Sequence, residues 1–211
     1  MTILLATIAI GGGLASALLT QRSALGSRLV KMLASSAMVA IVATGDPVLG
    51  GYTIFITAGL VASWFGDLAL SFKNQQAFLV GLISFALAHA LYTAAFFARS
   101  QMDLVSIAVS GVIMAITAAA ILRWLSPHVP HRLQTPVALY VGIISVMVVA
   151  SFGTSGALAD PRIPSAAVLF AISDVLVARQ QFVIPDVANR ILGLPIYYAA
   201  QVLFAITVVF P

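Results

Sequence analysis

The chain has 211 residues, of which 62% are hydrophobic and 8% are charged, and its mean hydropathy is +1.11. This composition excludes a soluble domain, because a soluble domain needs a charged surface around its apolar interior. The net charge of +4 is spread over loops, which excludes a dense basic surface for nucleic acid, and the lack of cysteine excludes disulfides. We therefore predict an all-α, polytopic membrane helix bundle.

Apolar runs bounded by charged residues, Pro or Gly recur along the whole chain. A helix needs about 20 apolar residues to cross a bilayer, so the chain has room for roughly eight crossings joined by short loops. We predict a single integral membrane domain over residues 1–211. Its eight helices are expected at about residues 3–20, 29–44, 52–72, 77–98, 103–125, 135–153, 163–180 and 191–210.

Lys and Arg are distributed unevenly among the predicted loops. Eight of the ten follow odd-numbered helices, and only Arg99 and Arg162 lie on the other side. The positive-inside rule therefore predicts that both termini are outside and that the loops after odd-numbered helices are cytoplasmic. Basic residues follow the first apolar run rather than precede it, so we expect this run to be a helix and not a cleaved secretory signal.

In the second predicted helix, Lys31 lies at the expected start, on the cytoplasmic side. One interpretation is that its side chain extends to water or to lipid headgroups. The other is that it serves as the countercharge of an aspartate or of a ligand phosphate. Tyr140 enters the sixth predicted helix from the same side and allows the same two interpretations.

Two aspartates lie inside predicted helices. Asp67 occurs in TIFITAGLVASWFGDLALSF and Asp174 in IPSAAVLFAISDVLVARQ. A carboxyl at this depth costs about 2.5–3.5 kcal/mol on insertion scales, which favours a functional role for each aspartate. Both lie shortly before a basic residue at the cytoplasmic end of an inward-running helix, so we expect them at a similar depth, where they could face each other. Their separation of 107 residues is close to half the chain and favours two parallel four-helix halves.

Further polar residues fall inside the fourth and eighth predicted helices. His89 and Tyr92, three residues apart, share one helical face, and Tyr197 and Gln201 share another. Tyr198 is either a site residue or an anchor at the membrane interface. Pro195 is expected near the first turn of its helix, where proline is tolerated. A catalytic zinc typically has three protein ligands, and the spans contain one His and no Glu or Cys, so the signal for a metal is weak and a metal could bind only through His89 and the aspartates.

Four motifs occur in order along the chain: FGD in the third predicted helix, GLISFALAHALY in the fourth, LFAISDVLVA in the seventh and YYAAQ in the eighth. Together they resemble the YhhN family of lysoplasmalogenase-type membrane proteins over the second to eighth helices. Two departures are Met32 after Lys31, where the family often has Pro, and Ala88 before His89, where it often has Gly. Neither removes a reactive group, and both leave the substrate of this member open.

The resemblance implies hydrolysis of the vinyl ether bond of choline or ethanolamine lysoplasmalogens to a fatty aldehyde and the glycerophospho headgroup. It implies that Asp67 and Asp174 are the acid and the base, without assigning either role, and that the substrate is a lysophospholipid reached through membrane lipids. Independently of the resemblance, we expect no cofactor, no nucleic-acid partner and a location in a bacterial inner membrane. The residues that the resemblance places around the substrate are His89, Tyr92, Tyr197, Tyr198 and Gln201. From their positions in the predicted helices, we expect Lys31 and Tyr140 to contact the substrate as well.

Two other functional classes would also explain aspartates inside membrane helices. A proton- or cation-coupled transporter would use them, with His89, to relay protons or to bind a cation. A lipid-binding or structural protein would use them only for hydrogen bonds between helices. Proton flux in liposomes would favour the transporter, whereas lipid turnover in detergent without a gradient would favour the enzyme.

Overall fold

The computed structural model describes residues 1–20, 22–99 and 101–210. Within these ranges it contains no strand and eight helices long and apolar enough to cross a membrane. A short 3₁₀ turn, Ser126–His128, follows the fifth helix, and a π-helical turn, Arg179–Val183, follows the seventh. The helices are α1 (Thr2–Leu19), α2 (Ala24–Thr44), α3 (Gly51–Leu70), α4 (Gln75–Ala98), α5 (Leu104–Leu125), α6 (His131–Leu158), α7 (Arg162–Ala178) and α8 (Val187–Val209).

Polar caps explain why several helices begin earlier than their apolar runs. Ser23 accepts a hydrogen bond from the Gly26 amide at 3.0 Å, so α2 begins at residue 24 and not near 29. Asp186 accepts from the Ala188 amide at 3.1 Å and starts α8 at residue 187. Because α8 starts early, Pro195 lies inside the helix and not in its first turn as expected, where it removes one helical hydrogen bond.

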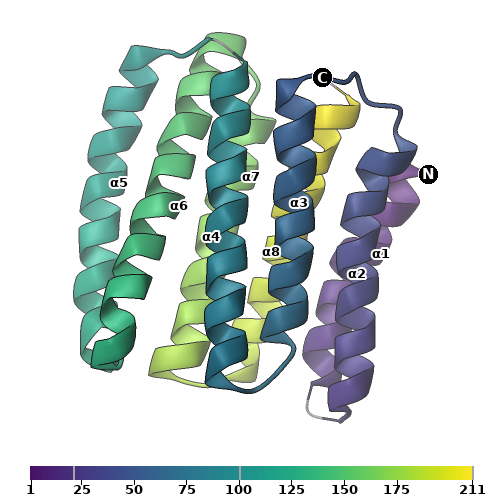
Figure 1. Cartoon of the computed structure of the whole chain (residues 1–211), viewed down its shortest axis with the longest axis vertical. Helices are drawn as coiled ribbons and strands as arrows, with labels where there is room; N and C mark the ends of the chain where they lie inside the picture. Colours follow the sequence, from purple (N-terminus) through teal and green to yellow (C-terminus); the bar gives the residue numbers. More distant parts are fainter. Residues whose placement is uncertain (21, 100, 211) are drawn as a thin grey trace.

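Consecutive helices alternate in direction, so α1 and α5 run the same way and both termini lie at one end of the bundle (Figure 1). The strongest packing is between α3 and α4, α1 and α2, and α7 and α8. Helices of the two halves also pack in corresponding pairs: α2 contacts α8, and α6 contacts α4. The exception is α5, which stands at one edge of the bundle and packs mainly against α6 (Figure 1).

At the end where the termini lie, Arg162 links the α6–α7 loop to the residue that follows α8. Arg162 donates to Asp160 from Nε at 2.8 Å and to the Phe210 carbonyl from Nη1 at 2.6 Å. Burial raises the pKa of Asp160, but the hydrogen bonds from Arg162 outweigh it and bring that pKa below its usual range. The opposite end, with the loops that follow α1, α3, α5 and α7, carries most of the basic residues.

Candidate functional site

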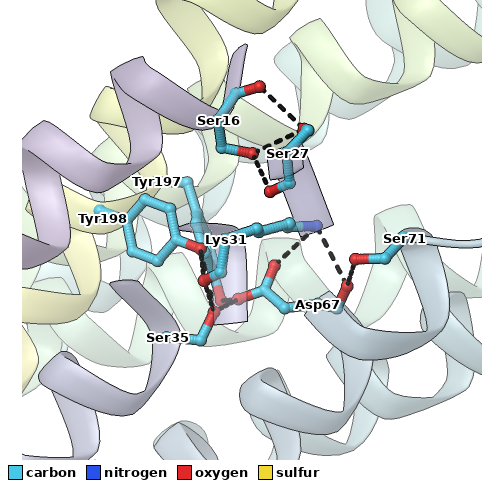
Figure 2. A network of polar contacts seen from close by, with 8 residues as sticks. All are labelled: Ser16, Ser27, Lys31, Ser35, Asp67, Ser71, Tyr197 and Tyr198. Atoms are coloured by element: carbon cyan, nitrogen blue, oxygen red, sulfur yellow. Dashed lines mark hydrogen bonds and ion pairs between the residues drawn. The ribbon is translucent and has the colours of Figure 1, made fainter. Parts of the chain in front are cut away.

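Asp67 lies near the end of α3 and is almost completely buried, with 2% of its side chain exposed. Its Oδ2 accepts hydrogen bonds from Ser35 Oγ at 2.7 Å and from Tyr197 Oη at 2.8 Å. The Lys31 ammonium lies 3.1 Å from Oδ1. Figure 2 shows these side chains meeting from α2, α3 and α8. One opposite charge and two hydroxyl donors therefore compensate the negative charge of Asp67.

Lys31 lies two turns inside α2, because that helix begins at residue 24. Only 12% of its side chain is exposed, and its ammonium also donates to the Asp67 carbonyl at 3.2 Å. The structure thus makes Lys31 the countercharge of an aspartate and does not extend it to headgroups. Tyr198 joins the same network (Figure 2), since its hydroxyl donates to the Lys31 carbonyl at 3.1 Å and lies 2.9 Å from Ser35 Oγ. Tyr198 is therefore not an interface anchor.

Asp174 lies on α7 and is held by two helices, α4 and α6. Tyr140 Oη donates to Asp174 Oδ2 at 2.6 Å, and His89 Nε2 lies 3.6 Å from the same oxygen. His89 is fully buried, whereas 17% of the Asp174 side chain is exposed. Among the described residues no Lys or Arg forms an ion pair with Asp174. The charge of this carboxyl therefore has no fixed cation beside it.

Aromatic rings fill the space between the partners of the two carboxyls. The Phe170 ring lies with its centroid 4.5 Å from that of His89 and 5.3 Å from that of Tyr197. Phe85 packs edge-on against Tyr197 at 5.7 Å. In the part of the chain that the structure describes, no hydrogen bond joins Asp67 and Asp174, and each has its own partners. The two carboxyls therefore do not form one hydrogen-bonded pair.

The two carboxyl sites have the same arrangement of helices around the aspartate. In each, the aspartate is contacted by the preceding helix of its own half and by the last helix of the other half. Each residue lies 107 to 109 positions from its counterpart, which supports the predicted relation between the two halves. The main chemical difference is that a lysine on α2 corresponds to a tyrosine on α6. The counterparts are Lys31, Asp67 and Tyr197 in one site and Tyr140, Asp174 and His89 in the other.

Both carboxyls open into one cavity of about 800 Å³. Its wall also includes Lys31, Tyr140 and Tyr197, and aliphatic side chains of α5, α6 and α7 supply much of the rest. Within the described ranges, no group of three or more His, Cys, Asp or Glu side chains is placed to hold a metal ion. The cavity therefore presents two carboxyls in different surroundings to whatever enters it.

Tyr92 and Gln201 lie behind this wall. The Tyr92 hydroxyl donates to Gln201 Oε1 at 2.6 Å, and both side chains are fully buried. Neither they nor His89 line the cavity, so the structure places these predicted site residues one layer further in. Sequence reasoning missed Ser35, although its position one turn after Lys31 on the same face of α2 was a usable signal.

Comparison with known proteins identifies the kind of protein that carries this arrangement. The sequence model described as the YhhN family matches residues 26–208, which includes both carboxyl sites. This chain belongs to the YhhN family. No solved structure matches it.

Curated relatives of this YhhN-family chain are named lysoplasmalogenases. Lysoplasmalogenase TMEM86A of Bos taurus is 32% identical over 160 residues, covering 73% of this chain and 65% of the relative. The human TMEM86A protein is 31% identical, with the same coverage of 73% and 65%. Human lysoplasmalogenase TMEM86B is 30% identical over 159 residues, covering 75% of this chain and 65% of the relative. The alignments thus span just under two thirds of the relatives' length.

Proposed function

We propose that this chain is a membrane-embedded hydrolase that cleaves the vinyl ether bond of lysoplasmalogens. The observation that carries the proposal is the apolar cavity onto which both Asp67 and Asp174 open, inside a bundle of membrane-spanning length. The names of the relatives supply the substrate class. A carboxyl that delivers a proton and a second that stabilises positive charge are the groups that this hydrolysis needs.

The reaction begins with transfer of a proton to the β-carbon of the vinyl ether, which leaves an oxocarbenium ion. Water then adds to the carbon bonded to the ether oxygen and gives up a proton, forming a hemiacetal. The hemiacetal collapses as its hydroxyl proton leaves and the glycerol oxygen is protonated, releasing a fatty aldehyde and the glycerophospho headgroup. The net change is the addition of one water molecule.

The different surroundings of the carboxyls support different roles. Asp67 has the Lys31 ammonium at 3.1 Å, so we assign it the ionised form that stabilises the oxocarbenium ion and orients water. Asp174 has a tyrosine hydroxyl at 2.6 Å and no fixed cation among the described residues, so we assign it the proton that reaches the β-carbon. Tyr140 and His89 hold the Asp174 carboxyl in place at the cavity wall.

Aldehyde release from a purified lysoplasmalogen in detergent tests this assignment. Asp67→Asn and Asp174→Asn should each lower kcat by roughly 10²–10⁴-fold, because each removes an acid–base or charge-stabilising group. Asp46→Asn is the matched control, since Asp46 lies in an exposed loop at φ 52°, a backbone region that Asn also tolerates. Full activity in either cavity variant would overturn the mechanism. Proton flux in liposomes without aldehyde release would instead support a carrier.

A further inference from the structure

An apolar trench continues from the two carboxyls along α5. This helix packs mainly against α6 and leaves one side turned toward α7. The side chains on that side line the trench and recur every three or four residues from Ser106 to Leu125. Facing side chains of α6 and α7 complete the walls. Residues that represent the three walls are Val109, Ile113, Val141, Ile144, Val168 and Ala171.

The length of the trench above the carboxyls corresponds to about one leaflet. On α6, Tyr140 marks the level of Asp174, and Phe152 lines the trench further toward the end of the bundle that holds the termini. At 1.5 Å per residue, these positions are about 18 Å apart along the helix. Half of a bilayer's hydrocarbon core is about 15 Å. A single chain that starts at the carboxyls and follows the trench therefore spans one leaflet.

The other end of the same cavity is basic. Arg28, Lys73 and Arg190 line it, and among the described residues none of the three is paired with a carboxylate. Arg28 stacks on the Phe72 ring with its guanidinium carbon 4.2 Å from the centroid, which fixes the charge at the cavity edge. Available cations at one end and an aliphatic trench at the other match a molecule with one anionic group and one long chain.

We propose that the trench between α5, α6 and α7 binds the single hydrocarbon chain of a lysophospholipid whose phosphate lies among Arg28, Lys73 and Arg190. This placement brings the bond between chain and glycerol to the level of Asp67 and Asp174. The inference deepens the proposed function and takes the identity of the cleaved bond from it. Binding itself needs no cleavage, so the two proposals fail separately.

Photo-crosslinking tests the placement with a lysophosphocholine that carries a saturated alkyl ether chain, which cannot be hydrolysed as a vinyl ether, and a diazirine at the chain end. In the purified full-length protein, the label should map to peptides of α5 and α6 near Val105 and Phe152. Excess unlabelled alkyl lysophosphocholine should compete, whereas an uncharged alkylglycerol with the same ether chain should compete poorly, because it lacks the phosphate. Equal competition by the alkylglycerol would contradict the phosphate site.

A matched pair of substitutions on α5 separates trench binding from general lipid contact. Ala118 lines the trench, whereas Ala120 is exposed on the opposite side of the same helix. Ala118→Trp should lower lysolipid affinity about tenfold or more by occupying the trench, and Ala120→Trp should leave it unchanged. Equal labelling in both variants, or labelling that unlabelled lysolipid does not displace, would mean that the trench holds bilayer lipid only. Lysolipid binding without aldehyde release would retain this inference and reject the proposed reaction.

Discussion

At the scale of single residues, the difference between Lys31 and Tyr140 distinguishes two otherwise similar carboxyl sites. Each contacts the aspartate of the next helix, Lys31 with an ammonium at 3.1 Å and Tyr140 with a hydroxyl at 2.6 Å. An ammonium brings a full countercharge into a buried site, whereas a hydroxyl donates a hydrogen bond without charge. In the proposed reaction, this difference would suit the two carboxyls to different steps.

Replacing Lys31 with Met should destabilise the protein by about 3–5 kcal/mol, because it leaves the buried charge of Asp67 without its partner. Thermal unfolding in detergent measures the loss. The double variant Lys31→Met/Asp67→Asn should recover much of this stability, since the neutral amide needs no countercharge, but it should stay inactive in aldehyde release. If the double variant were as unstable as the single one, the stabilising role of the ion pair would be contradicted.

The sequence alone identified the polar residues of the site because few polar side chains occur in these apolar runs. It could not show which of them pair, because pairing depends on how α2, α3 and α8 pack. In particular, the sequence could not show that Asp67 and Asp174 each have their own partners from neighbouring helices. Ser35 was missed because a serine in an apolar run has no signal of its own until Lys31 is placed on the same face.

At the scale of helices, close backbone approach between α3 and α4 sets the position of Tyr92. A methyl group added at Gly59 would lie 2.7 Å from Tyr92 Cδ1 and 2.9 Å from Cζ. The ring is fully buried, and its hydroxyl is bonded to Gln201, so it has little freedom to move. The glycine is therefore required by packing, and it allows α3 and α4 to pack closely at the level of Tyr92.

Gly59→Ala should destabilise the protein by about 1–3 kcal/mol through overpacking against Tyr92. Gly111→Ala on α5 is the matched control, because nothing lies within 4 Å of the added methyl group. The control should be neutral or stabilising by up to about 1 kcal/mol, the difference in helix propensity between Gly and Ala. Thermal unfolding of the two variants in the same detergent measures the contrast, and equal melting temperatures would contradict the packing argument.

Helix existence was easier to predict than helix ends. All eight apolar runs form helices, because a backbone in hydrocarbon must satisfy its own hydrogen bonds. The ends depend on polar caps and on turns outside the apolar run, and α6, which has no side-chain cap, extends over residues 131–158 where 135–153 was expected. The early start of α2 matters for the site, because it places Lys31 well inside the helix beside Asp67 and not at the helix end.

At the scale of the whole molecule, the orientation in the membrane decides from which side a headgroup enters. The basic end of the cavity lies at the end of the bundle that carries eight of the ten Lys and Arg residues. The positive-inside rule predicts that this end faces the cytoplasm. A lysophospholipid would then enter from the cytoplasmic leaflet, with its chain along α5.

Single-cysteine labelling tests this orientation without background, because the chain has no cysteine. Gln101 lies in the exposed α4–α5 loop at the end with the termini, and His128 is exposed between α5 and α6 at the other end. In intact cells, a membrane-impermeant maleimide should label Gln101→Cys, whereas His128→Cys should react only after permeabilisation. The two loops flank the same helix, so each variant controls for expression and insertion of the other. Labelling of His128→Cys alone in intact cells would reverse the orientation and move headgroup entry to the outer leaflet.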